Sequence, residues 1–474
     1  MKCAFLLLTG LSFAVNAQHY DNVNLARLAK VASSDGRVAA TIAETELWQT
    51  NIDECSKRGG GRVVVTKGRH VVGQLYLRNN VELYLEDGAC LEGAVGLHNY
   101  TLHRLPYSEG DWCAVVMGLN VTNVAITGRG EIFGNGASFE PVRTCGICWE
   151  GYRPRGVFFS DSQGIRLEDF KLRDAACWGI VFKCCEDIVA RRVTIDSNVN
   201  YNNDGFDIEA RNVLIEDCEV DSSDDAYCVK SNNPDFAVEN IVIRNCRVRS
   251  HCNGLKIGTA THGTIRGVRF ERCRTGASRR IYRDWAKVSD DPTAFVDIKD
   301  LPRYLCGPGI SAICIECVDG GIVEDVMVCD IETQGFQVPI FVRGGARRDR
   351  TCGIPPSNRN VFRNITISNV WGRAESAIAS SISGCKTCYP CNVKIANVNI
   401  SCKGTGQTSE PVCEPGSEYD ASYPEATMFS DIRLPAFGLY VGRSKNVDIE
   451  NVHFRLCAGE IDVRQPIFRS KCYK

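Results

Sequence analysis

The chain has 474 residues, of which 24% are charged, and its formal net charge is −2 with the two signs well mixed. It carries no basic cluster of the kind that binds a nucleic-acid backbone, and no basic amphipathic stretch of the kind that lies on a membrane surface. We therefore expect neither nucleic acid nor a membrane as a partner.

The first 17 residues, MKCAFLLLTGLSFAVNA, have the layout of a secretory signal peptide. A single lysine precedes an apolar run, and small residues stand just before Gln18. This is the pattern of a cleavable leader, and it is too short for a stable membrane span. We predict a signal peptide at residues 1–17 and a secreted, extracellular protein that consists of residues 18–474.

The cysteine content agrees with export. The chain has 26 cysteines, and such a content is typical of proteins that form disulfides outside the cytosol. We therefore predict disulfide bonds. Four N-x-S/T sequons would accept glycans in a eukaryotic host, and they lie at Asn99, Asn120, Asn364 and Asn399.

Short strand-like segments recur through most of the chain, each with apolar residues at alternate positions. They start at residues 123, 164, 187, 212, 240, 267, 325, 364, 392 and 446. Many spacings are about 23–28 residues, which is typical of solenoids, whereas the blades of a β-propeller need about 40–50 residues and fit less well. The segments show no 3.6-residue periodicity. The pattern predicts an all-β, single-domain right-handed parallel β-helix.

Two features complete the expected architecture. The segment 40–61 carries Trp48, Ile52 and Cys55 on one helical face and ends in glycines, so we predict a helix that covers the N-terminal end of the solenoid. Two irregular stretches, at about 275–305 and 403–435, are predicted to be loops inserted into the same domain.

Several cysteines hold regular positions in the repeats. Cys218, Cys246 and Cys273 occupy one position in three successive repeats, which predicts an inward stack with a packing role. For the C-x-x-C clusters zinc or redox chemistry is an alternative, but in an exported chain we favour disulfides, or packing for Cys314. These clusters are Cys145/Cys148, Cys314/Cys317 and Cys385/Cys388/Cys391.

Two acidic segments, NNDGFDIEA (202–210) and SSDDAYCVKS (222–231), align with CNGLKIGT (252–259) and VPIFVRGG (338–345). The alignment forms two inward apolar columns, which are Phe206, Tyr227, Leu255 and Ile340, and Ile208, Val229, Ile257 and Val342. Strand alternation then predicts that the outward side chains are Asp207, Glu209, Cys228, Lys230, Lys256, Phe341 and Arg343. At the start of the strands Asp204, Asp225 and Asn253 share a column, and Asp224 lies beside Asp225.

Three interpretations of these carboxylates compete. Aspartates are common in solvated turns, but four acids on adjacent coils would repel one another. A calcium site would suit oxygen ligands, yet Lys230 and Lys256 nearby would repel a cation, so we predict no metal and no other cofactor. Hydrolysis of a glycosidic bond needs one protonated and one ionised carboxyl group, and close carboxylates separate their pKa values in this way.

At this point the sequence resembles glycoside hydrolase family 28, the polygalacturonase-like pectinases. The similar segments are GGGRVVVTKGRHVVGQLYLRNNVELYLEDGACLEG (59–93), ITGRGEIFGNG (126–136) and the three motifs that contain Asp204, Asp224 and Lys256. The resemblance implies a single-domain right-handed β-helix and hydrolysis with inversion of configuration. It also implies that Asp224 is the general acid and that Asp204 and Asp225 hold and activate the attacking water. The strand register places Asp207 one step further along, where we expect it to contact or support the substrate.

The chain departs from the family pattern at two places. Cys252-Asn253-Gly254 stands where the pattern has Gly-His-Gly, and the nearby His251 either replaces the missing histidine through a different turn or is only a loop residue. Cys314-Ile315-Glu316 stands where the pattern has the Arg-Ile-Lys that holds the substrate carboxylate. We expect Lys230, Lys256 and Arg343 to supply the positive charge for substrate binding instead, together with contacts from His251 and Asn253.

These observations predict a monomeric, secreted inverting hydrolase that acts on an acidic plant cell-wall pectin, either a polygalacturonan or a rhamnogalacturonan. Two alternatives remain. One is a calcium-dependent β-helical polysaccharide lyase, and the other is a polysaccharide-binding protein without catalytic activity on the same scaffold.

Overall fold

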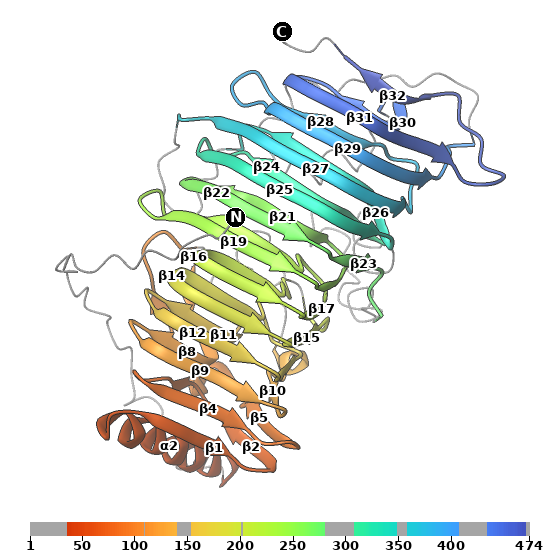
Figure 1. The fold of residues 1–474 in the computed structure, drawn as a ribbon. Helices are drawn as coiled ribbons and strands as arrows, with labels where there is room; N and C mark the ends of the chain where they lie inside the picture. Colours follow the sequence, from red (N-terminus) through yellow and green to blue (C-terminus); the bar gives the residue numbers. More distant parts are fainter. Residues whose placement is uncertain are drawn as a thin grey trace, which may run out of the picture.

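The computed structural model describes residues 36–108, 110–139, 153–200, 202–279, 308–347, 358–406 and 434–470, with side chains from residue 39 on. Within these residues, parallel strands stack one above another in a single 30-stranded sheet that winds along the molecule (Figure 1). An antiparallel pair, β6 (His103–Arg104) and β7 (Asp111–Trp112), lies outside this sheet.

The strands form three faces, each a ladder of parallel pairs. Face A contains β1 (Gly61–Val65), β4 (Val81–Leu85), β9 (Thr122–Gly128), β12 (Gln163–Glu168), β14 (Ile180–Arg191), β16 (Phe206–Glu216), β19 (Ala237–Arg244), β22 (Thr264–Glu271), β25 (Ile322–Thr333), β27 (Val361–Arg373), β29 (Cys391–Cys402) and β31 (Lys445–Leu456). Face B contains β2 (Gly68–Val72), β5 (Ala89–Gly93), β10 (Glu131–Phe133), β13 (Lys171–Arg173), β15 (Thr194–Ser197), β17 (Glu219–Ser222), β20 (Arg247–Ser250) and β23 (Arg274–Gly276).

Face C carries the candidate site. It contains β3 (Leu75–Tyr76), β8 (Ala114–Leu119), β11 (Arg155–Ser160), the first halves of β14 and β16, β18 (Tyr227–Ser231), β21 (Asn253–Thr261), β24 (Gly309–Cys317), β26 (Phe336–Gly344), β28 (Ser380–Ser383), β30 (Ala436–Val441) and β32 (Gln465–Arg469). Two short 3₁₀ helices, η1 (Leu97–Asn99) and η2 (Gly136–Ser138), lie in the connections.

The repeat read from the sequence is the ladder of face A. Val124 pairs with Ile165 and Ile165 with Ile188, and the same inward position continues coil by coil to Val393 and Val447. These side chains fill the interior because successive residues of a strand point to opposite sides. The prediction of a right-handed parallel β-helix is confirmed.

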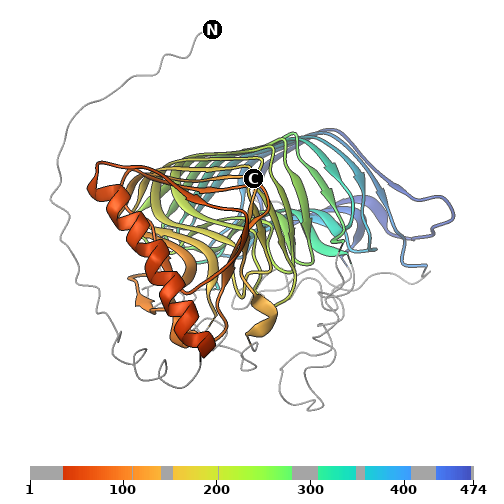
Figure 2. The same ribbon diagram turned by 90° about the horizontal axis from the view of Figure 1, so that it is seen from below.

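Helix α2 (Gly36–Lys57) covers the N-terminal end of the solenoid, as predicted (Figure 2). Its Trp48, Ile52 and Cys55 are buried against the first coils. The Gln49 side chain donates to the carbonyl of Tyr76 at 3.0 Å and accepts from the amide of Tyr76 at 2.8 Å. The helix therefore covers the apolar interior of the first coils and forms hydrogen bonds with a backbone amide and carbonyl there.

The inward cysteine stack is confirmed, and Cys314 packs in a buried apolar cluster, as the packing alternative predicted, instead of pairing with Cys317. Cys218, Cys246 and Cys273 are at most 2% exposed and form no disulfide. Cys314 and Cys317 lie in one extended strand, β24. Three residues of strand separate their Cα atoms by about 10 Å, beyond the reach of a disulfide.

Cys385 and Cys388 are also free thiols. Hydrogen bonds, and not a disulfide, join these two residues within their turn. The amide of Cys388 donates to Sγ of Cys385 at 3.3 Å, and the amide of Cys385 donates to the carbonyl of Cys388 at 2.8 Å. Cys391 is free as well. Cys145 and Cys148 lie outside the described residues.

The predicted signal peptide and most of the two predicted inserted loops also lie outside the described residues. In the described part of the chain, no helix combines the length and the apolar character that crossing a bilayer requires.

Candidate active site

The acidic segments lie on adjacent coils of face C, in the register predicted from the sequence. Phe206 pairs with Tyr227, and Tyr227 pairs with Leu255. The column continues through Ile313 of β24 to Ile340. Just before these strands, the amide of Gly205 donates to the carbonyl of Asp225, and the amide of Ala226 donates to the carbonyl of Asn253, both at 2.8 Å. Asp204, Asp225 and Asn253 are therefore stacked neighbours.

Small polar side chains fix the turn that carries Asp224. The hydroxyls of Ser222 and Ser250, from two successive coils, both donate to the backbone carbonyl of Asp224 at 2.6 Å. The amide of Asp225 donates to Oδ1 of Asp224 at 2.8 Å. Both serines are fully buried, so the backbone of Asp224 is held from below while its side chain stays half-buried at the surface.

The loop before Asp204 is fixed in the same manner. The side-chain amide of Asn203 donates to the carbonyls of Ala175 and Cys177 at 2.8 and 2.9 Å, and its oxygen accepts from the amide of Asn200 at 2.7 Å. Asn203 is therefore chiefly structural, since it ties one coil to the coil below it, whereas Nδ2 of Asn202 donates to Oδ2 of Asp224 at 3.5 Å.

The outward side chains of face C are buried. Asp207, Lys230, Lys256 and Arg343 are each at most 8% exposed. Two apolar clusters flank these charges on the same side of the sheet. One contains Trp112, Phe158 and Trp178, and the other contains Cys314, Phe341 and Tyr440. The charged groups therefore interact in an environment with little water.

Two lysines pair with the buried carboxylates. Nζ of Lys230 lies 2.6 Å from Asp207 and 3.3 Å from Asp204. Nζ of Lys256 lies 3.0 Å from Asp225. Buried carboxylates need such partners because an isolated charge is costly away from water. The structure thus brings together five of the predicted site residues in two linked ion-pair groups.

Asn253 holds Asp225 in place. Its side-chain amide donates to Oδ1 of Asp225 at 2.8 Å, and its own Oδ1 accepts from the hydroxyl of Ser311 at 2.5 Å. Asn253 is fully buried. Both donors around Asp225, Asn253 and Lys256, favour the ionised form of this carboxyl group.

The three candidate carboxyl groups differ in their pKa values. Burial, together with repulsion by Asp225, raises the pKa of Asp224 to about 6. Burial and the neighbouring Asp207 raise the pKa of Asp204 well above its usual range. Burial also opposes ionisation of Asp225, but Lys256, Lys230 and Asn253 outweigh it and hold the pKa of Asp225 below its usual value. The site thus contains a protonated acid next to an ionised carboxylate.

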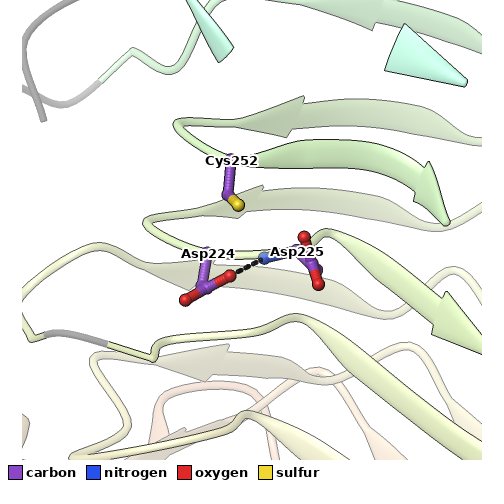
Figure 3. Close-up of side chains that lie close together, drawn as sticks. All are labelled: Asp224, Asp225 and Cys252. Carbon is purple, nitrogen blue, oxygen red and sulfur yellow. Dashed lines mark hydrogen bonds between the residues drawn. The ribbon is translucent and has the colours of Figure 1, made fainter. Parts of the chain in front are cut away.

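Figure 3 shows that the thiol of Cys252 points from the next coil toward Asp224 and Asp225. One ligand atom from each of these residues lies within 4.8 Å of the others, a spacing that a metal ion could bridge. Lys256, at 3.0 Å from Asp225, already neutralises one of the two carboxylates. The donor set therefore fits a hard oxygen-seeking cation such as calcium poorly, because it combines a thiol with a lysine-paired carboxylate.

The comparisons with known proteins agree with this geometry. A family model described as glycosyl hydrolases family 28 matches residues 55–280, which contain all three candidate carboxyl groups. The match covers slightly less than half of the chain, which is similar to this family over that range. This similarity, together with the polygalacturonase relatives, indicates a glycosidase.

Its relatives are distant. A probable polygalacturonase of Vitis vinifera is 25% identical over 48% of the chain, and an exopolygalacturonase of Zea mays is 22% identical over 81% of it. The chain spans half the length of the first and 84% of the second.

Solved structures share the fold. An exopolygalacturonase from Thermotoga maritima has a TM-score of 0.53 at 21% identity and covers 75% of this chain and 87% of its own. A family 28 exopolygalacturonase from Yersinia enterocolitica has a TM-score of 0.60 at 16% identity and covers 90% of this chain and 74% of its own.

The structure also places the two remaining predicted residues, His251 and Arg343. His251 is buried, and its amide donates to the carbonyl of Ser222 at 3.1 Å, so its backbone sits one coil above the turn of Asp224. Arg343 lies on β26, two coils beyond Lys256, where it is in register with Glu316 and donates to the hydroxyl of Ser383 at 3.2 Å.

Sequence reasoning missed Trp178 as a neighbour of the site. Nζ of Lys230 lies 3.9 Å from the centre of the Trp178 ring, a cation–π contact that adds to its ion pairs. The amide of Gly179 donates to the carbonyl of Asp204, which places Trp178 in the column of the stacked acids. Aligning CWGIVFK (177–183) with NNDGFDIEA would have found this residue.

Proposed function

We propose that this protein is a family 28 glycosidase that hydrolyses glycosidic bonds in a pectic polysaccharide, with inversion of configuration. The observation that carries the proposal is the placement of Asp224, which has a raised pKa, next to Asp225, which has a lowered one. Inverting hydrolysis requires one carboxyl group that donates a proton and another that activates water.

The roles follow from protonation and exposure. Asp224 is half-buried and protonated near pH 6, so it can give its proton to the leaving oxygen. Asp225 stays ionised beside Lys256 and accepts a proton from water. Asp204 orients that water with Asp225, and Lys230, which contacts Asp204 and Asp207, positions this second carboxyl group.

The pectic substrate is proposed from the relatives, which are named polygalacturonases and exopolygalacturonases. We also propose that residues 1–17 are a signal peptide, that residues 18–474 form the secreted catalytic domain, and that the mature protein is a monomer. The leader pattern of the sequence supports the proposal of export.

The experiment that tests this function is incubation of the purified protein with a panel of pectic polymers. The panel includes polygalacturonan and rhamnogalacturonan, and release of reducing ends is measured together with product size and, by NMR, the anomeric form of the first product. We expect new reducing ends with inverted configuration. Growth of ultraviolet absorbance that calcium chelation abolishes would instead identify a lyase, and binding without cleavage would identify a binding protein.

The matched control is Asp224→Asn, which keeps the shape of the side chain but removes its proton. We expect it to lower kcat by at least about a thousandfold while polysaccharide affinity and circular dichroism stay unchanged, because general acid catalysis is lost. Wild-type turnover by this variant would refute the assignment of Asp224.

A further inference from the structure

We infer that Glu316 makes this site selective for a pectic backbone with a neutral sugar beside the cleaved bond, rather than for one made only of uronic acids. The inference rests on the proposed hydrolysis of pectin and names its substrate class. Glu316 acts through the lysine and arginine that it neutralises, and it is a positioning residue rather than a catalytic one.

Glu316 lies at the centre of the cationic end of the site. It follows Cys314 on β24 and is fully buried. Its carboxylate is 3.9 Å from Nζ of Lys256, and its backbone is in register with Arg343 on the next coil. On the preceding coil stands Gly258, where a Cβ would lie 3.0 Å from Cβ of Glu316. The missing side chain at Gly258 leaves room for the carboxylate between the two cations.

The charges of the site are balanced among themselves. Four cations, Lys183, Lys230, Lys256 and Arg343, lie along this part of face C, and each has an acidic neighbour. Lys183 lies 3.1 Å from Glu209, Lys230 pairs with Asp207, Lys256 pairs with Asp225, and Arg343 stands beside Glu316. The two carboxyl groups with raised pKa values, Asp204 and Asp224, stay protonated in mildly acid solution and add no negative charge.

This balance disfavours a uronate next to Lys256 and Arg343. A substrate carboxylate binds strongly to a cation that lacks another partner, because binding then adds a charge-assisted hydrogen bond without breaking an existing one. Here the substrate would have to compete with Asp225 and Glu316 in a region with little water, where separating a buried ion pair is costly. A neutral sugar imposes no such competition. Without Glu316, Lys256 and Arg343 would add a net positive charge and favour a uronate.

The test compares two defined oligosaccharides of equal length, one of galacturonate only and one of alternating rhamnose and galacturonate. For the wild-type enzyme we expect kcat/KM to be at least about tenfold higher on the alternating substrate. For Glu316→Gln, which removes the charge and keeps the shape, we expect the ratio to move by at least about tenfold toward the galacturonate substrate, chiefly through KM.

Two further variants separate charge from packing. Glu316→Asp keeps the charge and should keep the wild-type ratio. Glu239→Gln removes a partly exposed carboxylate on β19, a strand of face A, where it pairs with Arg266, and should change nothing. Equal ratios in wild type and Glu316→Gln would overturn the inference.

If Glu316→Gln does not fold, the inference is tested by the ratio of the wild-type kcat/KM values on the two oligosaccharides. A higher kcat/KM on the galacturonate substrate would overturn this inference and leave the proposed hydrolase intact. A lack of cleavage of every pectic polymer would instead overturn the proposed function, and the inference with it.

Discussion

Asp224 and Asp225 are adjacent in sequence, yet their surroundings drive their protonation in opposite directions. Asp225 is fully enclosed and faces Lys256 and Asn253, whereas Asp224 faces the surface and receives repulsion from Asp225. The turn between β17 and β18, which contains both residues, directs their side chains to different environments. Two chemically identical groups can therefore take the roles of acid and base.

The pH dependence of hydrolysis follows from these shifts. The group that must be protonated is Asp224, so kcat/KM should fall as the pH rises through about 6. The group that must be ionised is Asp225, so activity should persist down to a pH below the usual pKa of an aspartate, and decline only below that. A pH profile of kcat/KM on a pectic oligosaccharide measures both limbs.

Lys256→Gln sharpens this prediction. Removing the ammonium group that lowers the pKa of Asp225 should move the acid limb to higher pH by about one unit, since an opposite charge at this distance shifts a carboxyl pKa by about 1–3 units. Lys394→Gln, which changes an exposed lysine on β29, serves as the control. An acid limb that does not move would contradict the role of Lys256.

At the scale of the elements, face A is bordered by a row of side-chain amides in left-handed turns. The row has positive φ values of 60° at Asn364, 53° at Asn392 and 53° at Asn446. Nδ2 of Asn392 donates to Asn364 at 3.2 Å, and Nδ2 of Asn446 donates to Asn392 at 2.9 Å. Asparagine tolerates this conformation better than most residues, and the same side chain ties successive coils together.

The row explains why the repeats begin with Asn, Gly or Asp, and it predicts the effect of substitution. Asn392→Ala should lower the free energy of unfolding by about 1–3 kcal/mol, because it loses two hydrogen bonds and strains the turn. Asn392→Gly should cost less, because glycine adopts the positive φ freely. Urea denaturation of unglycosylated protein measures both, with the exposed Asn399→Ala on the same strand as the control. Equal stability of Asn392→Ala and wild type would refute this role.

At the scale of the whole molecule, a solenoid needs a cover where its interior would otherwise meet water. Helix α2 supplies it at the N-terminal end, with Ile52 fully buried and Trp48 in an edge-to-face contact with His70 at a centroid distance of 5.2 Å (Figure 2). Because coils contact mainly their neighbours, loss of the cover should unravel the molecule from this end.

Ile52→Ala tests the cover. It removes buried methyl groups and should lower the free energy of unfolding by about 2–4 kcal/mol. Leu47→Ala, on the exposed side of the same helix, should change stability little. Thermal and urea denaturation measure the difference. Hydrogen exchange should accelerate first in β1 to β5, and uniform acceleration along the solenoid would contradict an end effect.

The sequence by itself determined the architecture and the neighbours in the ladder. The period of the repeat and the alternation of apolar residues fixed which side chains enter the interior, because a strand has only two faces. The same register placed Asp204 on Asp225 and Asn253, and placed Cys314-Ile315-Glu316 one coil beyond Lys256. Local patterning was sufficient there since each coil repeats the geometry of the last.

Only the tertiary structure decided the environment of those residues. Strand alternation placed the charges on the outer side of the sheet, but it carries no information on what covers that side, where the charged side chains are buried and flanked by two apolar clusters. The same holds for pairing partners. Lys230 reaches two aspartates of one coil while Lys256 reaches an aspartate of another, so ion pairs set the pKa values of the acids across coils that the sequence separates by more than twenty residues. The length and direction of each lysine side chain, and not the order of the strands, determine which aspartates it pairs with.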